Sequence, residues 1–491
     1  MARKAKAALS PEIGAFVDRY VDELINGKGS VFLGAGMSVD AGFVNWKGLL
    51  KNIAAELGLD VDRETNLVAL AQYHYNERNN RSELNQRILA EFTEEQKLTP
   101  SHHVLARLPI GHYWTTNYDR LIETALNAQN RRPDVKFTAE HMKLTKPGHD
   151  AVVYKMHGDV EHPNDAILTK DDYEGYFREH ETFVTALSGD LVQTTMLFLG
   201  FSFTDPNIDY VLSRVRVTLR KKPKSHYCIL CRLHRSAREK KENFEYRKRQ
   251  QDYLIKDLRR LGIQALMIDE YKEVPQILAL IEARYRQRTV FVSGAAHTFP
   301  APWNATRAHQ LLAGLSSALI RKRLNVVTGF GLGVGTSVVS GALETILGDK
   351  AKYRDTQLQA SPFPVSADDR GRSKLYRQHR ERVLAKCGIA VFAFGTKLEG
   401  SKVVEAKGMR EEFEIARNDD LIVIPIGATG SVARDLWNQV NAEFDEFYPN
   451  VSTAFARNFK RLGQDTTTVD ELISAVMSMV EELRRLPCQL A

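Results

Sequence analysis

Short runs of apolar, aromatic and β-branched residues alternate with long helical stretches along most of this 491-residue chain. In the first half these runs lie at 30–33, 112–116, 151–156, 196–201 and 227–231. Short apolar runs are typical of strands that are buried on both faces, and strands that alternate with helices form parallel sheets. The sequence therefore predicts an α/β fold.

The same pattern begins again after a basic connector at 284–288. A domain usually holds about 100–200 residues, so a chain of this length is expected to form more than one. We expect two Rossmann-like domains with parallel sheets, at residues 1–284 and 285–491. The first domain carries a helical insertion at about 46–106. The strands expected in the second domain are 289–293, 325–328, 389–394 and 421–425.

Composition excludes several classes of protein. The values of 43 % apolar and 26 % charged residues are ordinary for a globular chain, and there is no apolar run of 18 residues. The chain has four cysteines, too few for a disulfide framework, and its start lacks the apolar stretch of a signal peptide. We expect a cytoplasmic protein. The basic runs at 220–224 and 238–249 permit a nucleic-acid surface, but a solvated loop and helix face are favoured.

The segment Val31–Gly42 reads VFLGAGMSVDAG, an apolar strand that leads into a glycine turn and a helix. Such turns bring the backbone close to a pyrophosphate at a helix N-terminus. This turn is not the GxGxxG dinucleotide fingerprint, because Val39 occupies the third glycine position. Close packing between strand and helix is the alternative interpretation.

Three later segments place polar residues at the ends of predicted strands. They read WTTNYD with Asn117, KMHGD with His157, and GFSFTDPN at 200–207. In parallel sheets, ligands bind at the carboxyl ends of the strands. We therefore expect these residues to share one crevice with the glycine turn.

Together the four blocks resemble the sirtuin superfamily, in its bacterial defence-associated branch. The resemblance implies that Asn117 lies against the nicotinamide ribose of NAD and a water, and that His157 is the general base. Asp119 either belongs to this NAD site or caps the following helix, and capping is favoured. The residues implied to hold the phosphates and adenosine of NAD are Gly34, Ala35, Gly36, Ser38, Gly200, Ser202 and Asp205.

The residue types suit cleavage of NAD to ADP-ribose and nicotinamide. Nicotinamide leaves readily, so an amide that orients water or ribose and a neutral imidazole that accepts a proton are sufficient. Protein-deacylating sirtuins carry two CxxC pairs for zinc, whereas this chain has one, at Cys228 and Cys231, within an apolar run. We therefore expect no metal. A protein deacylase, an ADP-ribosyltransferase and a non-enzymatic nucleotide- or nucleic-acid-binding module remain alternatives.

The second domain has its own glycine turn, NVVTGFGLGVG, with Gly329, Gly331, Gly333 and Gly335. It is either an anion-binding turn or a site of close backbone packing. With the segments IAVFAFGTK and MREEFEIA, this half resembles the SLOG family of Rossmann-like nucleotide sensors. The resemblance implies that the signal contacts Arg380, Lys397, Glu412 and the glycine turn.

A sirtuin-like domain followed by a SLOG domain resembles the effector family of Thoeris anti-phage defence. In that family a partner with a TIR domain makes a cyclic ADP-ribose isomer, which the SLOG domain binds. Binding switches on NAD depletion by the first domain and causes abortive infection. The resemblance also implies a homotetramer or a filament. A second catalytic site in the SLOG-like half is the alternative, although no acid–base pair stands near these residues.

Overall fold

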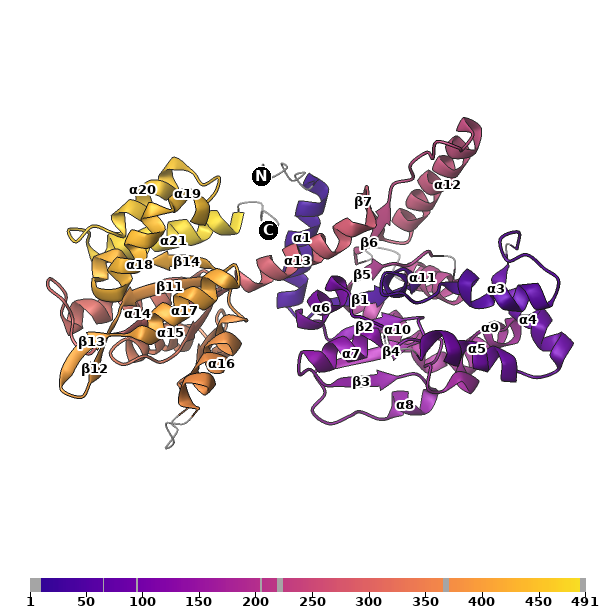
Figure 1. The fold of residues 1–491 in the computed structure, drawn as a ribbon, viewed down its shortest axis with the longest axis horizontal. Helices are drawn as coiled ribbons and strands as arrows, with labels where there is room; N and C mark the ends of the chain where they lie inside the picture. Colours follow the sequence, from indigo (N-terminus) through magenta and orange to yellow (C-terminus); the bar gives the residue numbers. More distant parts are fainter. Residues whose placement is uncertain are drawn as a thin grey trace. The chain divides into compact units, whose positions relative to one another are not determined.

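The computed structural model describes residues 10–64, 66–93, 96–203, 205–218, 224–364 and 371–485. These residues fall into two compact units, one ending at Glu282 and the other beginning at Ala283. Each unit is built around its own parallel sheet (Figure 1). Both sheets and their covering helices confirm the predicted α/β class.

The described residues of the first unit form a seven-stranded sheet in the order β3-β4-β2-β1-β5-β6-β7, with every pair parallel. The central strand β1 lies between β2 and β5, so the turns that follow these strands emerge at the same edge. The strands are β1 Gly29–Leu33, β2 His112–Thr115, β3 Pro133–Lys136, β4 Ala151–Lys155, β5 Thr195–Leu199, β6 His226–Cys231 and β7 Ile263–Ile268.

Sequence reasoning missed β3. This four-residue strand begins with Pro133 and lies at the edge of the sheet, where it pairs only with β4 among the described strands. Proline has no N–H to donate to a neighbouring strand, so it is confined to edge strands and strand starts. The strand also contains too few apolar residues in succession to be recognised in the sequence.

Helices occupy the expected insertion between β1 and β2. Its helices α3 to α5 enclose a separate apolar core, which includes Leu50, Ile53 and Leu84. The basic run at 238–249 lies mostly on the exposed helix α12, while 219–223 lie outside the described residues. The helices of this unit are α1 Pro11–Ile25, α2 Ala35–Val39, α3 Trp46–Glu56, α4 Leu67–Arg78, α5 Ser82–Phe92, α6 Pro100–Arg107, α7 Leu121–Ala128, α8 Ala139–Lys143, α9 Lys170–Glu179, α10 Glu181–Gln193, α11 Pro206–Thr218, α12 Lys241–Arg260 and α13 Val274–Arg286, which ends beyond Glu282.

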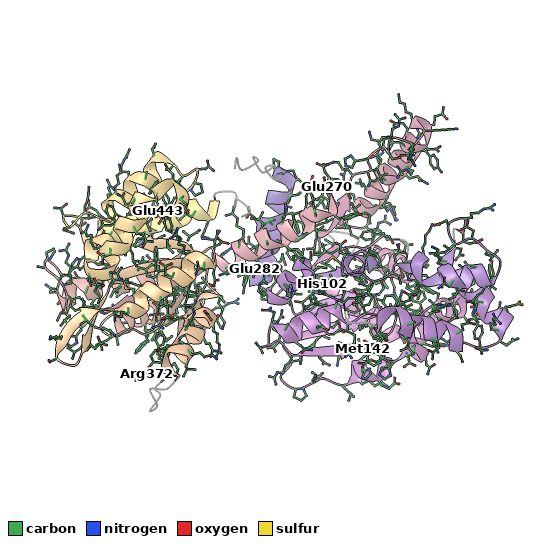
Figure 2. The ribbon with its side chains drawn as sticks, in the orientation of Figure 1. His102, Met142, Glu270, Glu282, Arg372 and Glu443 are labelled. Carbon is green, nitrogen blue, oxygen red and sulfur yellow. The ribbon has the colours of Figure 1, made fainter. Side chains whose placement is uncertain are left out.

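Histidines outside the predicted motifs have structural roles. His102, labelled in Figure 2, is buried in α6, where its Nδ1 lies 2.8 Å from the Thr99 hydroxyl. His112 lies at the start of β2, where its Nδ1 is 2.8 Å from Asp190. These contacts account for both side chains without a ligand.

The described residues of the second unit form a five-stranded parallel sheet in the order β10-β9-β8-β11-β14. An antiparallel hairpin, β12–β13, follows β11. Neither the three-residue edge strand β10 nor the hairpin was predicted, because short polar strands leave no apolar run. The strands are β8 Thr289–Ala295, β9 Asn325–Thr328, β10 Leu358–Ala360, β11 Ile389–Phe394, β12 Thr396–Glu399, β13 Lys402–Glu405 and β14 Ile422–Pro425.

In this unit α14 and α15 cross at a very short distance. A Cβ on Gly341 of α15 would lie 2.1 Å from the carbonyl oxygen of Ala313 in α14. Only glycine allows this approach. The helices of this unit are α14 Ala305–Arg321, α15 Gly335–Gly348, α16 Arg372–Leu384, α17 Lys407–Asn418, α18 Ser431–Ala442, α19 Phe444–Phe447, α20 Thr453–Arg461 and α21 Val469–Arg485.

Within the described part of the chain, no helix combines the length and apolar character needed to cross a membrane.

We predict that Gly341→Ala lowers the free energy of unfolding of the second unit by about 1–3 kcal/mol, because the added methyl forces α14 and α15 apart. Urea unfolding followed by circular dichroism measures the change. Gly348→Ala, in the same helix but facing open space, is the control and is expected to be neutral or slightly stabilising. Equal midpoints for the two variants would contradict the close helix contact.

Candidate active site

The two glycine-containing turns at 34–36 and 200 lie directly against each other. A Cβ on Gly34 would lie 2.4 Å from the carbonyl oxygen of Gly200, and one on Gly36 would lie 2.8 Å from the Cα of Gly200. The Gly34 N–H donates to Leu199, and the Gly36 N–H donates to Gly200. These glycines are therefore required by backbone packing, and their contact with NAD phosphates stays a prediction.

Asn117 follows β2 and is fixed by three hydrogen bonds. Its backbone N–H donates to the Thr115 hydroxyl at 2.9 Å. Its side-chain Nδ2 donates to the Gly34 carbonyl at 3.1 Å and to the Ser38 hydroxyl at 2.8 Å. The amide oxygen Oδ1 has no partner among the described residues, so it is the end of the side chain that a ligand could use.

Asn117 lines a pocket beside the glycine turn. In this conformation the pocket leaves about 30 Å³ that a water-sized sphere can reach. Ser38 and Asp119 contribute polar atoms, and the start of the helical insertion contributes an apolar wall. The lining residues are Ala35, Ser38, Val44, Asn45, Trp46, Leu49, Phe92, Thr116, Asn117, Tyr118 and Asp119.

Asp119 is buried and both of its carboxylate oxygens are engaged. Oδ1 accepts from the backbone N–H of Leu121, at the start of α7, and Oδ2 accepts from the Ser38 hydroxyl at 2.6 Å. Asp119 therefore closes the turn before α7, whose N-cap residue is Arg120, and its place in an NAD site stays a prediction. Through Ser38, the same carboxylate also fixes the amide of Asn117.

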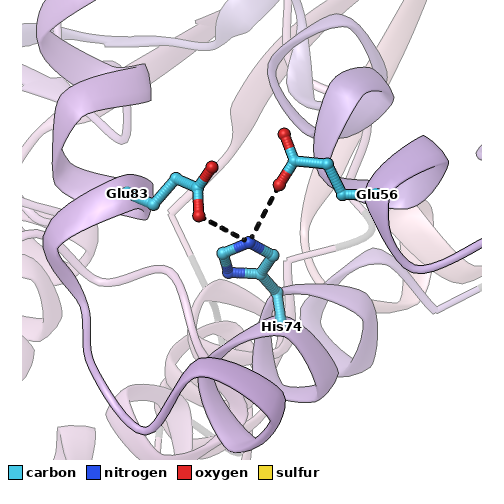
Figure 3. Close-up of side chains that lie close together, drawn as sticks. All are labelled: Glu56, His74 and Glu83. Atoms are coloured by element: carbon cyan, nitrogen blue, oxygen red, sulfur yellow. Dashed lines mark hydrogen bonds and ion pairs between the residues drawn. The ribbon is translucent and has the colours of Figure 1, made fainter.

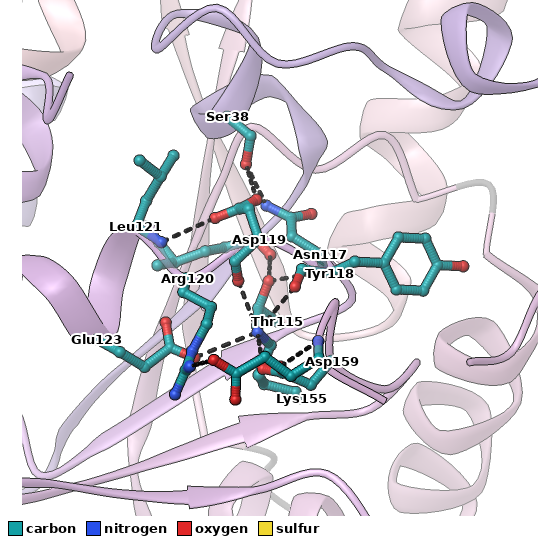
Figure 4. A network of polar contacts seen from close by, with 12 residues as sticks. Ser38, Thr115, Asn117, Tyr118, Asp119, Arg120, Leu121, Glu123, Lys155 and Asp159 are labelled. Atoms are coloured by element: carbon teal, nitrogen blue, oxygen red, sulfur yellow. Dashed lines mark hydrogen bonds and ion pairs between the residues drawn. The ribbon is translucent and has the colours of Figure 1, made fainter. Parts of the chain in front are cut away.

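Lys155, at the end of β4, is fully buried and ties the Asn117 turn to the His157 turn (Figure 4). Its ammonium donates to the carbonyl oxygens of Tyr118 and Asp119 at 3.0 and 2.6 Å. It also pairs with Asp159 at 2.5 Å and with Glu123 at 3.2 Å. Burial alone would lower the pKa of Lys155, but these carboxylates hold it above its usual value.

His157 follows β4 by two residues and is 1 % exposed. Burial lowers the pKa of the imidazole, although Asp205 and Asp172 act in the opposite direction. The ring of His157 packs edge-on against Tyr173 and Tyr176, with ring centroids 5.5 and 6.2 Å away. Burial thus favours the neutral form of the imidazole, which is the form that a general base uses.

The structure brings only part of the predicted site into one pocket. Ala35, Ser38, Asn117 and Asp119 line it, whereas His157 lies beside Asp205 and Tyr173 and is not part of the lining. Trp46 of the pocket wall lies 6.4 Å from Tyr173, centroid to centroid. Ser202 and Gly200 belong to the turn after β5.

Sequence reasoning missed three contributors to this site. Lys155 stood inside the KMHGD motif but was given no role, Trp46 was placed only in a helical stretch, and Tyr173 was not considered. An aromatic residue just after the helix cap at Asn45 was a weak signal for Trp46. Tyr173 gave none, because its place depends on how α9 packs against the sheet.

The single CxxC pair does not resemble a zinc site. Cys228 and Cys231 lie in the same strand, β6, three positions apart, so their side chains point to opposite faces. Cys228 is buried in the core, and the Cys231 thiol donates to the carbonyl of Asp269. This geometry does not let both thiolates bind one ion.

A second titratable cluster joins three helices of the insertion (Figure 3). The buried Nε2 of His74 lies 3.3 Å from a carboxylate oxygen of both Glu56 and Glu83. Arg87 pairs with Glu56, and Arg78 pairs with Glu83. Because the two arginines already balance the two carboxylates, the cluster acts as an ion-pair link between α3, α4 and α5.

In the second unit, the glycine turn packs against the end of β8. A Cβ on Gly331 would lie 2.0 Å from the Gly294 carbonyl oxygen, and one on Gly333 would lie 2.1 Å from that of Ala296. A Cβ on Gly335 would meet the backbone of Phe330. Close packing therefore explains these three glycines, and their contact with a signal stays a prediction.

Arg380 and Glu412 come together beside Gly329, the remaining glycine of the turn. Arg380 Nε lies 3.6 Å from Glu412 Oε1, and its guanidinium carbon lies 4.7 Å from the centroid of the Phe363 ring. A Cβ on Gly329 would contact both Phe363 and Glu412. Burial raises the pKa of Glu412, against the hydrogen bond from Ser293 and the charge of Arg380.

Lys397 does not join this group through any contact among the described residues. It lies in β12, half-exposed, with its ammonium 3.6 Å from Glu399. Arg380 also forms an ion pair with Glu411, with 2.8 Å between its Nη1 and the carboxylate oxygen Oε2. The predicted signal residues thus form one cluster of Gly329, Arg380 and Glu412, with Lys397 separate.

Comparison with known proteins covers both units. Residues 111–255 match a SIR2-like domain, and residues 273–483 match the Sir2- and TIR-associating SLOG family. A relative named NAD(+) hydrolase ThsA, from Bacillus cereus (strain MSX-D12), is 43% identical over 97% of this chain and 99% of its own length. The chain belongs to the ThsA family.

Two further relatives match to different extents. The NAD(+) hydrolase ThsA of Acinetobacter baumannii (strain 532279) is 43% identical over 95% of this chain and 98% of its own. A protein of Bacillus subtilis named Defense-associated sirtuin 2 is 26% identical over 39% of this chain and 19% of its own. Membership of the ThsA family confirms the resemblance to sirtuins and to SLOG proteins that the sequence motifs indicated.

We predict that Lys155→Met lowers the free energy of unfolding of the first unit by about 3–5 kcal/mol, because it leaves buried carboxylates without a cation. Urea unfolding measures this change. Lys170→Met, at an exposed pair in α9, is the control and is expected to change the value by less than about 1 kcal/mol. A loss for Lys155→Met no larger than for the control would show that the buried ammonium stabilises nothing.

Proposed function

We propose that this chain hydrolyses NAD+ to ADP-ribose and nicotinamide at the site formed by Asn117 and His157. The observation that carries the activity is its similarity, over almost the whole length, to relatives named NAD(+) hydrolase ThsA. The position of Asn117 supports the site, because its amide is fixed at one end and open to a pocket at the other.

Asn117 and His157 fit the roles that hydrolysis of the nicotinamide–ribose bond requires. The bond between ribose C1′ and the nicotinamide nitrogen breaks, and its electron pair neutralises the pyridinium. A water oxygen bonds to C1′, and a water proton passes to His157. Asn117 Oδ1 orients the water or a ribose hydroxyl, and the burial that keeps His157 neutral lets it accept the proton.

We further propose that the second unit is a sensor for a cyclic ADP-ribose isomer made by a TIR-domain partner. The matched family is described as associating with Sir2 and TIR, which supports this pairing. Arg380 suits a pyrophosphate, and Glu412 suits ribose hydroxyls. Bound signal would activate the first unit, deplete cytoplasmic NAD+ and abort infection, as in Thoeris defence.

Control at a distance requires two states with different affinities for the signal. Closed assemblies of identical subunits provide such states, because one contact is repeated in every subunit. We therefore propose that the chain acts as a homotetramer or a filament. Both units match defence-associated families, which supports the proposal that binding at the second unit controls the activity of the first.

We predict that Asn117→Ala and His157→Ala each abolish release of nicotinamide from NAD+ while the protein stays folded, because each removes a group that orients or deprotonates the attacking water. Chromatography of the products, with circular dichroism as the check on folding, measures both. Asn127→Ala, on the exposed face of α7, is the control and is expected to keep full activity. Wild-type rates in either site variant would refute the assignment.

We predict that Lys397→Glu keeps NAD+ binding but loses activation by the cyclic ADP-ribose isomer, because it reverses a charge expected to meet a phosphate. The measurement is nicotinamide release over a panel of isomers. Lys402→Glu, on the facing strand of the same hairpin, is the control. If both variants respond as wild type does, Lys397 lies outside the sensor site.

A further inference from the structure

The carboxylate of Asp205, which the resemblance implies to hold NAD, lies beside the proposed base. Asp205 Oδ2 is 3.3 Å from Nε2 of His157 and 3.5 Å from the hydroxyl of Tyr173, which donates to it. Both nitrogens of the His157 ring are buried, and neither makes an aligned hydrogen bond with any residue that the structure describes. A buried imidazole without aligned partners is uncommon in a folded protein, which points to a functional constraint.

The other oxygen of Asp205 fixes its direction. Oδ1 accepts from the backbone N–H groups of Asn207 and Ile208, at 2.9 and 3.2 Å, at the start of α11. The carboxylate is therefore held by a helix terminus, with Oδ2 turned towards His157. Such a support is what a catalytic imidazole needs to keep one orientation.

We propose that Asp205 is the positioning residue of His157, which orients its ring through Nε2 and leaves Nδ1 as the proton acceptor. The inference rests on the proposed NAD+ hydrolysis. When His157 accepts the proton from water, the carboxylate stabilises the imidazolium that forms. Hydrogen bonds at catalytic sites are often long before substrate binds, so the 3.3 Å contact is expected to shorten in the complex.

The groups that face His157 make Asp205 its nearest charge. Tyr173 and Tyr176, from α9, stay neutral because burial raises their pKa well above 10. Asp172 acts on His157 from the same helix but is already paired with Arg81.

Burial also lowers the pKa of the neighbouring His180, which favours its uncharged form. Removal of the Asp205 charge should therefore lower the pKa of His157 further. A change of substrate affinity alone would not have this effect.

The test is Asp205→Asn in the full-length protein. Asparagine caps a helix as well as aspartate does, so α11 keeps its start while the charge is lost. We expect kcat to fall by about 10- to 1000-fold with KM for NAD+ within about 2-fold. We also expect the acid limb of the kcat–pH profile to move to lower pH. Asp209→Asn, one turn further along α11 and exposed, is the control and should match wild type.

A second measurement does not depend on turnover. NMR titration of the His157 ring should give a lower pKa in Asp205→Asn than in wild type. An unchanged pKa and unchanged kcat would overturn the proposal and leave Asp205 as a helix cap only. A raised KM with unchanged kcat would also overturn it, in favour of NAD+ binding. If wild type and His157→Ala release nicotinamide equally, the proposed function fails instead, whatever the titration shows.

Discussion

The buried ammonium of Lys155 is the interaction on which the candidate site depends. A charge in a protein interior is tolerated only when oxygen atoms surround it, and here they come from two different turns and from Glu123 of α7. The turn after β2 supplies backbone carbonyls, and the turn after β4 supplies Asp159. The residues that we assign to NAD+ chemistry, Asn117 and His157, sit on these two turns. One cation therefore ties the two turns together, in addition to the pairing of β2 with β4.

A second constraint comes from backbone contact. The turns after β1 and β5 touch at Gly34 and Gly200, so closely that side chains are excluded. Because β1 lies between β2 and β5, the four turns that carry the motifs meet at one edge of the sheet. The ion pairs of Lys155 and the close contact between Gly34 and Gly200 thus both fix the positions of these turns.

Much of this arrangement could be predicted from the sequence. The strands that carry the motifs are short but continuous apolar runs, and their parallel arrangement follows from the intervening helices. The short edge strands β3 and β10 could not be predicted, because they lack a continuous apolar signal.

The partners of individual side chains were harder to predict. Asp205 was assigned to NAD by resemblance, and its proximity to His157 was not predicted, because that contact depends on how the chain turns after β5. In the second unit, Arg380 and Glu412 were expected to act together and do lie together, whereas Lys397 does not contact them.

The seclusion of His157 has a chemical consequence. A side chain with 1 % exposure and a wall of tyrosine rings exchanges little with solvent. In this conformation the imidazole is shielded from acylating reagents as well as from water and from NAD+. The rate at which such a reagent modifies His157 would therefore report how often the site opens. This rate could be measured even when no substrate is present.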